Sequence, residues 1–500
     1  MNKALAWTID SLISHWASTP KSPIDGPAKV RIAIVGGGFS GVATALRLMQ
    51  QRIGNRLQIT LIERDERVGA GVAFGTIRTT DLLNVPAGRM SVYEDDPLHF
   101  CRWLLKRGGA AQDGEVLFAP RRQYSDYLRE TLQSVTSQVR PSAEFNTIRD
   151  EAIAIRRFNN DEIEYAVQLR SGASVAADAV VLATGWQGVR RVEACTQSIL
   201  ESSRYVDRCW SQGAFDAFAS TDRVLVLGTG LSMFDTAMTL DARGHGGHVT
   251  AISRRGLLPQ SHAPNGVYQV PRELQDVLLN ADGEGLSEQI QRVRDDIRNI
   301  SENGQNWRAV FAALRPLSAK IWQSWSTTRR RRFLIHVAPY WDVHRHRCSP
   351  QASSLIRDLQ AKHQLTTAAG RVTHIEPVSD GFQVTWLPRG FSKQDNRRLH
   401  VHRIVNCLGP ETDVRRSELP VMQQLLKDGL ICPDELGWGI RLDANLQTIS
   451  SRGNIVRGLH VIGPILRGNF GEATAVPELR QFATQVADQL LERVTEPVST

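Results

Sequence analysis

Short apolar runs separated by glycine-rich turns open the chain, and they predict strands that are buried on both faces. Residues 30–35 form one such run, and a helical stretch over 42–49 follows the turn after it. A second apolar run over 57–62 ends at Glu63. A strand, a glycine turn, a helix and a second strand that ends in an acid are the parts of a parallel α/β unit.

The same arrangement returns near the middle of the chain. Residues 223–227 form an apolar run, Gly228 and Gly230 stand in the turn behind it, and residues 248–252 form the next run. Two such units predict an α/β fold with two Rossmann-type dinucleotide-binding domains.

After the second unit the apolar spacing becomes helical. Trp307, Val310, Phe311 and Leu314 stand at i, i+3, i+4 and i+7, which is the period of one helix face. The spacing predicts a helical insertion at about 265–345 within the second domain. Its aromatic stripe is expected to be core rather than a ligand site.

Strand and helix patterns resume in the last third of the chain, with strand-like segments over 382–387, 403–408 and 459–462 and a closing helix over 477–493. An amphipathic stretch near the N-terminus, with Leu5 and Trp16 at its ends, is expected to pack on the protein body. The predicted domains are an N-terminal extension (1–28), the first part of an FAD-binding domain (29–220), an NADPH-binding domain with the insertion (221–409) and the C-terminal part of the FAD-binding domain (410–500).

Composition narrows the classes of function. No apolar run approaches the roughly 20 residues that span a bilayer, and no secretory signal is visible, so a cytoplasmic protein without membrane contact is expected. The six cysteines form no Cys-x-x-Cys pair, which argues against structural zinc and a redox disulfide. The net charge of +8 suits phosphorylated cofactors or acidic substrates. The basic run 329–332 is expected to be a solvated helix face, and no nucleic-acid motif accompanies it. Homo-oligomers stay possible.

The first glycine turn has the parts of a pyrophosphate site. Gly36 makes the turn, Gly38 leaves room for the phosphates, and Gly41 lets the helix approach the strand. Glu63 stands where a carboxylate accepts hydrogen bonds from the ribose. The further residues predicted for this site are Phe39, Ser40 and Arg64.

FAD is the cofactor predicted for this first motif. Flavoproteins of the two-dinucleotide type usually bind FAD first, and an apolar strand over 179–182 leads to Ala-Thr-Gly, where the chain crosses back under the cofactor. A third contact is expected at Gly463, where the last apolar strand ends. Thr184 and Gly185 are therefore predicted FAD contacts.

NADPH is the cofactor predicted for the second motif. Met233 replaces the third glycine, which should shift the helix outward without blocking the phosphates. Ser253, Arg254 and Arg255 end the next strand in place of a carboxylate, and guanidinium groups suit a 2′-phosphate. The set predicted to bind NADPH is Gly228, Gly230, Leu231, Ser232, Met233, Ser253, Arg254 and Arg255.

Six segments between and around the motifs match a known family pattern: LLNVPAGRMS at 82–91, APRRQYSDYL at 119–128, GTGLSMFD at 228–235, YWDVHRHR at 340–347, NCLGP at 406–410 and EATAVPELR at 472–480. Through them the chain resembles the bacterial FAD/NAD(P)-binding proteins that include nitrosuccinate-forming flavin N-monooxygenases.

The resemblance implies a position for the reacting groups. It places the loop 84–90 beside the isoalloxazine ring, with Asn84, Val85, Arg89 and Met90 as site residues. It also points Arg345 and His346 into the interdomain cleft, where Arg89, Arg345 and His346 are the catalytic candidates. A salt-bridged helix end is the alternative for the Arg345 and His346 pair.

The chemistry follows from what the sequence lacks. No cysteine pair supports disulfide reduction, and the Baeyer–Villiger fingerprint Phe-x-Gly-x-x-x-His-x-x-x-Trp is absent between the two units. The expected function is N-oxygenation of a small amine, such as an amino acid or hydroxylamine, by dioxygen through a C4a-(hydro)peroxyflavin. An NADPH-linked oxidoreductase or oxidase without oxygen transfer, or a low-turnover flavin-binding partner protein, stays open.

Overall fold

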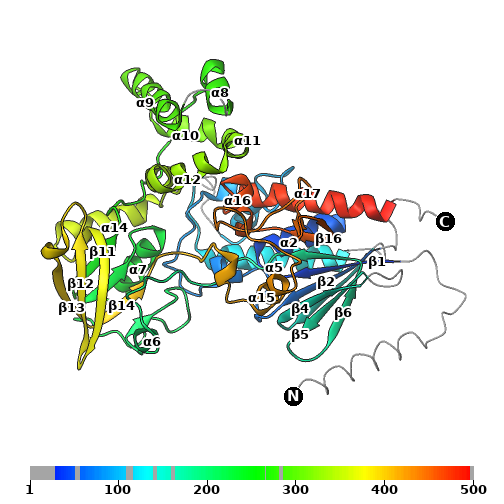
Figure 1. Cartoon of the computed structure of the whole chain (residues 1–500), viewed down its shortest axis with the longest axis horizontal. Coiled ribbons are helices and arrows are strands. Elements are labelled where there is room, and N and C mark those ends of the chain that lie inside the picture. Colours follow the sequence, from blue (N-terminus) through cyan, green and yellow to red (C-terminus); the bar gives the residue numbers. More distant parts are fainter. Residues whose placement is uncertain are drawn as a thin grey trace, which may run out of the picture.

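A six-stranded sheet forms the core of the first dinucleotide-binding unit in the computed structural model (Figure 1). Its strands lie in the order β15-β16-β7-β1-β2-β3, and only the β15–β16 pair is antiparallel. The structure describes residues 29–50, 57–108, 116–138, 143–158, 164–264, 266–280 and 285–495. The strands are β1 (Val30–Val35), β2 (Leu57–Glu63), β3 (Ala143–Arg149), β7 (Ala179–Leu182), β15 (Gln447–Ile449) and β16 (Ile455–Val461).

Helices cover this sheet, which is why its central strands are apolar on both faces. The closing helix α17 (Val476–Thr495) packs against α2 (Phe39–Gln50), so the two ends of the described chain meet in one domain. Helix α5 (Arg121–Gln138) also contacts α2. The same domain contains a small antiparallel sheet of β4 (Ala152–Arg157), β5 (Tyr165–Leu169) and β6 (Ser174–Ala177). Its remaining helices are α3 (Gly71–Phe74), α4 (His99–Leu105), α15 (Pro420–Lys427) and α16 (Arg467–Phe470).

A seven-stranded sheet forms the second unit, in the order β13-β12-β11-β10-β9-β14-β8. The strands from β11 to β8 are parallel, and β12 and β13 extend the edge as an antiparallel hairpin. Its elements are β8 (Tyr205–Val206), β9 (Val224–Leu227), α7 (Leu231–Ala242), β10 (Val249–Ser253), α14 (Pro350–Ala361), β11 (Leu365–Val378), β12 (Gly381–Pro388), β13 (Arg397–Val401) and β14 (Arg403–Asn406).

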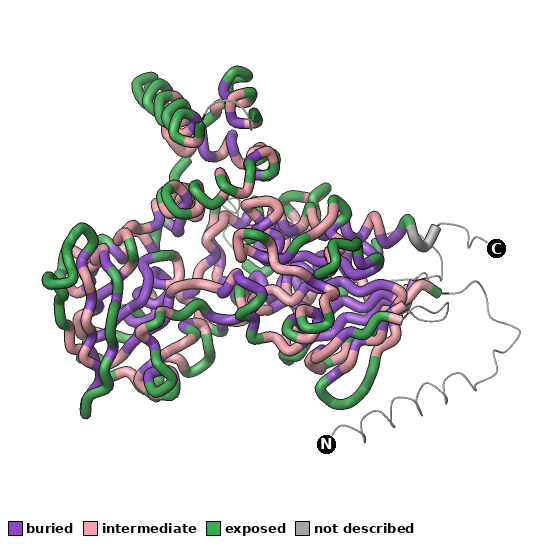
Figure 2. Tube along the Cα trace, in the orientation of Figure 1, coloured by how far each residue is buried: buried purple, intermediate pink, exposed green. Residues whose placement is uncertain are grey.

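The predicted insertion is helical. Its outer part rises away from both sheets, and its inner helix α11 (Ser318–Ser324) packs against α16 (Figure 1). Its outer helix α9 is largely exposed, whereas the inner helices carry buried faces (Figure 2). Bidentate hydrogen bonds from Arg315 to Glu478, at 2.6 and 2.9 Å, tie it to α17. Its helices are α8 (Arg272–Leu279), α9 (Leu286–Glu302), α10 (Arg308–Leu314), α11 (Ser318–Ser324), α12 (Thr327–His336) and α13 (Ala338–Arg345).

The structure confirms the predicted fold class and most element positions. Helix α2 begins earlier than the hydrophobic pattern suggested, because Gly41 belongs to its first turn rather than to the loop. Strand β8 precedes residue 221 in sequence but pairs with β14 of the second sheet, and the domain limits stay a prediction. The predicted amphipathic stretch between Leu5 and Trp16 lies outside the described residues. Among the described helices, none has the length and apolar character that crossing a bilayer requires.

Candidate functional site

The glycines of the first turn have two different roles. Gly36 and Gly41 allow the backbone to pack closely, whereas Gly38 leaves space in a cavity. Gly36 has φ +108°, and a Cβ there would lie 2.3 Å from the carbonyl oxygen of Ala183. A Cβ on Gly41 would lie 1.9 Å from the Gly36 carbonyl oxygen. A Cβ on Gly38 would meet only Gly71 Cα, at 3.6 Å, which is ordinary contact. The fold therefore does not require glycine at position 38, whereas the open space of the cavity does.

Glu63 is held at the end of β2 with its carboxylate toward this turn. Its Oε2 accepts from the Gly37 N–H at 2.6 Å and its Oε1 from the Asp65 N–H at 2.9 Å, and burial raises its pKa. The turn faces a cavity of about 560 Å³. The predicted FAD residues that line it are Gly36, Gly38, Phe39, Ser40, Glu63, Arg64, Asn84, Thr184 and Gly185.

Gly463, at the end of the last parallel strand, lies beneath the same turn. Its φ is +122°, and a Cβ there would lie 3.7 Å from Ser40 Oγ. Val85 and Met90 do not line the large cavity but a neighbouring pocket, together with Asn84. The predicted FAD contacts other than Gly41 and Gly463 thus line two adjoining spaces.

The second glycine turn opens onto the same large cavity. Gly228 has φ +107° and would place a Cβ 2.5 Å from the Cys407 carbonyl oxygen, whereas a Cβ on Gly230 would meet no atom within 4 Å. Gly230, Leu231 and Ser232 line the cavity at the N-terminus of α7, where backbone N–H groups favour phosphate. Met233 is fully buried in the core of the second sheet.

Ser253, the last residue of β10, and the two arginines after it have different surroundings. Ser253 shapes the turn, because its Oγ lies 2.8 Å from Thr229 Oγ1 and accepts from the Gly256 N–H at 3.0 Å. Arg255 donates to the Ile335 carbonyl oxygen at 2.9 Å. Arg254 makes no side-chain hydrogen bond to any described residue.

Arg254 instead belongs to a cluster of positive charge that the sequence did not reveal. Partial burial lowers its pKa, and the charges of Arg190, Arg255 and Arg371 lower it further. Such repulsion is relieved when an anion binds. Arg190 and Arg371 come from distant parts of the chain, so no spacing or motif could have shown them.

The pocket beside the large cavity measures about 240 Å³ and is rich in arginine. Arg345 lines it, but its guanidinium pairs with Glu472 at 2.7 Å and Glu478 at 3.0 Å, and its side chain is only 11% exposed. This geometry favours the salt-bridged helix end. Arg89 makes no ion pair within the described residues, and burial together with the charges of Arg315 and Arg345 lowers its pKa. Arg89 is thus the more available cation.

Two histidines line the same pocket as neutral imidazoles. Burial and the neighbouring arginines hold the pKa of His346 well below its usual value. Burial, with Arg347, Arg89 and Arg308, lowers the pKa of His262 to about 4, and its Nε2 lies 3.0 Å from the Asn84 carbonyl oxygen. His262 was missed in the sequence because it belongs to no motif, and Arg347 was not singled out within the segment 340–347.

Stability should therefore fall in mild acid. The native state keeps His262 neutral down to about pH 4, whereas the unfolded chain is protonated at this residue near pH 6.5. The stability that depends on neutral His262 is therefore complete above pH 6.5. It is lost as the pH falls toward 4, because protons then bind to the unfolded chain first. Between pH 7 and pH 5 the loss should be about 2 kcal/mol. When urea unfolding is measured across this pH range, the free energy of unfolding should change less steeply with pH in His262→Gln than in the wild type. The exposed His374→Gln should keep the pH dependence of the wild type. Equal slopes for all three proteins would contradict this.

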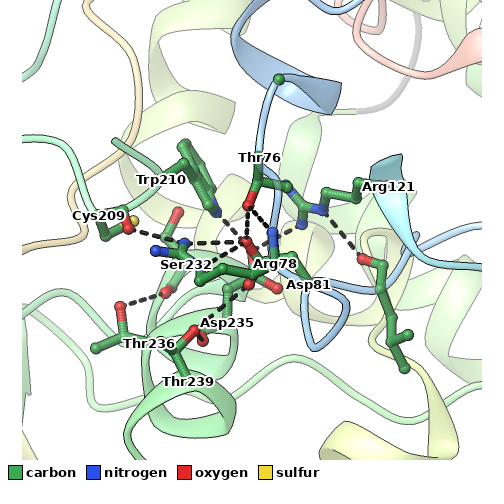
Figure 3. A network of polar contacts seen from close by, with 12 residues as sticks. Thr76, Arg78, Asp81, Arg121, Cys209, Trp210, Ser232, Asp235, Thr236 and Thr239 are labelled. Carbon is green, nitrogen blue, oxygen red and sulfur yellow. Dashed lines mark hydrogen bonds and ion pairs between the residues drawn. The ribbon is translucent and has the colours of Figure 1, made fainter. Parts of the chain in front are cut away.

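A buried network of charges joins the two dinucleotide-binding units (Figure 3). Arg121, at the start of α5, pairs with Asp235 of α7 at 2.7 Å, and their side chains are 9% and 5% exposed. The Trp210 indole N–H donates to the same Asp235 oxygen at 3.0 Å. Asp81 is fully buried and accepts from Arg78 at 3.0 Å. The network fixes the N-terminus of α7 relative to the first sheet.

Comparisons with known proteins agree with this architecture. Residues 33–187 match a family model described as FAD-NAD(P)-binding. An uncharacterised protein of Mycobacterium tuberculosis is 23% identical over 93% of this chain and 96% of its own. The FAD-dependent urate hydroxylase of Xanthomonas campestris pv. campestris is 31% identical over 41% of each chain.

Solved structures resemble the chain over nearly its whole length. The L-lysine 6-monooxygenase of Pseudomonas syringae aligns with a TM-score of 0.62 at 19% identity, over 94% of this chain and 100% of its own. An ornithine N-hydroxylase of Kutzneria sp. 744, solved with reduced FAD, NADP⁺ and L-ornithine, aligns with a TM-score of 0.61 at 16% identity, over 93% and 100%. The chain therefore has the fold of the two-dinucleotide-binding flavoproteins, with an FAD-NAD(P)-binding domain at residues 33–187.

Proposed function

We propose that this protein is an FAD- and NADPH-dependent monooxygenase that N-oxygenates an amine. The observation that carries the proposal is that both glycine turns open onto one cavity. A nicotinamide bound at the second turn can then meet a flavin bound at the first. The neighbouring arginine-lined pocket offers a separate, partly enclosed place for a substrate.

The residues around the cavity suit these cofactors. The helix N-termini and open positions at Gly38 and Gly230 accept pyrophosphates, and Glu63 suits the adenosine ribose of FAD. Reduced flavin supplies the activation of dioxygen. The chain's own part is to align the two rings and to exclude water. Neutral His346 lines both the large cavity and the arginine pocket, where it can hydrogen-bond an amine without repelling it.

In the arginine-lined pocket, Arg89 makes no ion pair with a described residue and can contact an anion. Arg345 instead holds Glu472 and Glu478 in place. The structural neighbours named for lysine and ornithine hydroxylation support an amine as the oxygenated group. The relative that is a urate hydroxylase favours a second candidate, oxygenation of a flat heterocycle.

The decisive experiment measures NADPH oxidation, oxygen uptake and products with the yellow protein. L-lysine, L-ornithine, aromatic amino acids and urate form the panel. An oxygenated amine formed in step with NADPH use supports the proposal, and an oxidised urate product supports the second candidate. Hydrogen peroxide alone across the panel would favour an oxidase, and no NADPH oxidation would favour a flavin-binding partner protein.

Arg254→Ala should lower the affinity for NADPH and spare NADH. Loss of a charge-assisted phosphate contact costs about 1.5–3 kcal/mol, or roughly ten- to more than hundredfold in affinity. The measurement is the KM for each nucleotide during anaerobic flavin reduction. Arg204→Ala, a change away from the cluster, is the control. An equal rise in both KM values would mean that Arg254 does not contact the 2′-phosphate.

A further inference from the structure

A cavity of about 510 Å³ lies between the helical insertion and the C-terminal part of the first domain. It is separate from the arginine-lined pocket, although the two adjoin at Phe311 and His346. Aromatic rings dominate its wall. They include the rings of Phe311, Trp322, Trp325, Phe333, Trp341 and Trp438.

The aromatic wall is held in place by specific contacts. Trp322 stacks on Trp438 with ring centroids 5.8 Å apart, and its indole N–H donates to the Gly468 carbonyl oxygen at 2.9 Å. A Cβ on Gly471 would lie 3.0 Å from the Trp322 ring, so glycine is what lets the ring lie there. The Trp325 indole N–H is buried without a hydrogen-bond partner among the described residues. The cavity thus has a fixed shape, and the Trp325 indole N–H is an unused donor at its wall.

The cavity meets the dinucleotide cavity at a pair of opposite charges. Asp342, His346 and Arg467 line both spaces. The Asp342 side chain is 43% exposed, and its carboxylate lies 3.8 Å from Nε2 of the neutral His346. The Arg467 Nε–H is buried without a hydrogen-bond partner among the described residues, and its guanidinium lies 4.0 Å from the Trp438 ring centroid.

Other charges near this junction are already engaged. Glu472 accepts from the Trp341 indole N–H at 3.1 Å and pairs with Arg345 at 2.7 Å. Burial raises the pKa of Asp342, and Glu472 adds to this, whereas Arg467 and Arg345 lower it. A ligand that brings both a cation and an anion would satisfy Asp342 and Arg467 together without adding net charge to the site.

We propose that this cavity binds the ring of an aromatic α-amino acid, whose ammonium group contacts Asp342 and whose carboxylate contacts Arg467. The ring would bury its surface against the tryptophans, and the amine would lie where the aromatic cavity meets the dinucleotide cavity. A linear amino acid such as lysine would leave the apolar space unfilled. The amine's oxygenation rests on the proposed function, whereas the binding itself does not.

The test is calorimetric titration of the FAD-loaded protein with four ligands, with no turnover required. L-tryptophan has ring, ammonium and carboxylate. Tryptamine lacks the carboxylate, indole-3-propionate lacks the ammonium, and L-lysine lacks the ring. L-tryptophan should bind most tightly, and each analogue should bind about tenfold or more weakly, because each loses one charge-assisted contact or the buried ring.

Two variants locate the site. Asp342→Asn should weaken L-tryptophan and tryptamine by about ten- to hundredfold and leave indole-3-propionate unchanged. Ser318→Phe, which fills the cavity from α11, should weaken all three indoles. The matched control is Asp295→Asn on exposed α9. Flavin content and NADPH-driven flavin reduction should stay at wild-type levels in Ser318→Phe, which shows that the protein is folded.

The outcomes separate this inference from the proposed function. L-lysine binding as tightly as L-tryptophan, no binding of any indole, or an equal effect of Asp342→Asn on all three indoles would overturn the aromatic site. L-tryptophan binding that depends on Asp342, with no oxygenated product in the presence of NADPH and oxygen, would support the site and contradict the monooxygenase.

Discussion

Gly38→Val is expected to yield a folded but colourless protein. The valine side chain would project into the cavity that Gly38 lines, where the FAD pyrophosphate is proposed to lie. The protein itself would tolerate the change, because a Cβ at this position meets only Gly71 Cα, at 3.6 Å, and the backbone is not in the left-handed region. Loss of flavin would therefore report on the cofactor and not on the fold.

The measurement is the ratio of flavin to protein after purification, with far-ultraviolet circular dichroism and the urea midpoint as checks on folding. Gly246→Val is the matched control, because this exposed glycine lies in the turn after α7 and a Cβ there would meet only the Ser220 carbonyl oxygen, at 3.9 Å. The control should stay yellow. A yellow Gly38→Val protein with full flavin content would mean that the first motif does not bind FAD.

Asp235→Ala is expected to destabilise the protein by about 3–5 kcal/mol, because it leaves the Arg121 guanidinium buried and unpaired. The same change removes the acceptor of the Trp210 indole N–H. Adding Arg121→Met should recover much of the loss, since the buried charge is then gone. Chemical denaturation of the two single variants and the double variant forms a cycle that isolates the coupling between the two charges.

An exposed pair provides the comparison. Asp295 and Arg298 on α9 lie 3.1 Å apart with side chains that are 51% and 65% exposed, and Asp295→Ala should cost at most about 1 kcal/mol. A similarly small cost for Asp235→Ala would mean that the network does not hold the two units together. Because Asp235 lies one turn beyond Ser232, its loss should also slow anaerobic flavin reduction by NADPH, which stopped-flow absorbance measures.

The sequence by itself determined the fold class and the two nucleotide turns, because these depend on local backbone geometry. Gly36 and Gly228 both have positive φ and both lie against a neighbouring strand's carbonyl oxygen. A glycine in that position can be recognised from the amino-acid sequence alone, because an apolar strand precedes it. Continuous apolar runs likewise located the strands, and the helical period located the insertion.

Only the tertiary structure decided what the long-range charges do. Arg345 was a candidate for substrate contact, but Glu472 and Glu478, more than a hundred residues away in sequence, occupy its guanidinium. Arg371 adds to the cluster around Arg254 only because β11 lies beside β10 in the sheet. Ion pairs between residues that are distant in sequence leave no local sequence pattern, because charges interact through space and not along the chain.

The aromatic stripe shows the same limit for packing. The helical period correctly placed Val310 and Leu314 in a buried core. The same period placed Trp307 and Phe311 on that helix face, yet these residues also line an open cavity. A hydrophobic period reports which face turns away from water. Whether another side chain fills the space beyond that face depends on how the insertion packs against Trp438 and Gly471, which the sequence pattern alone cannot determine.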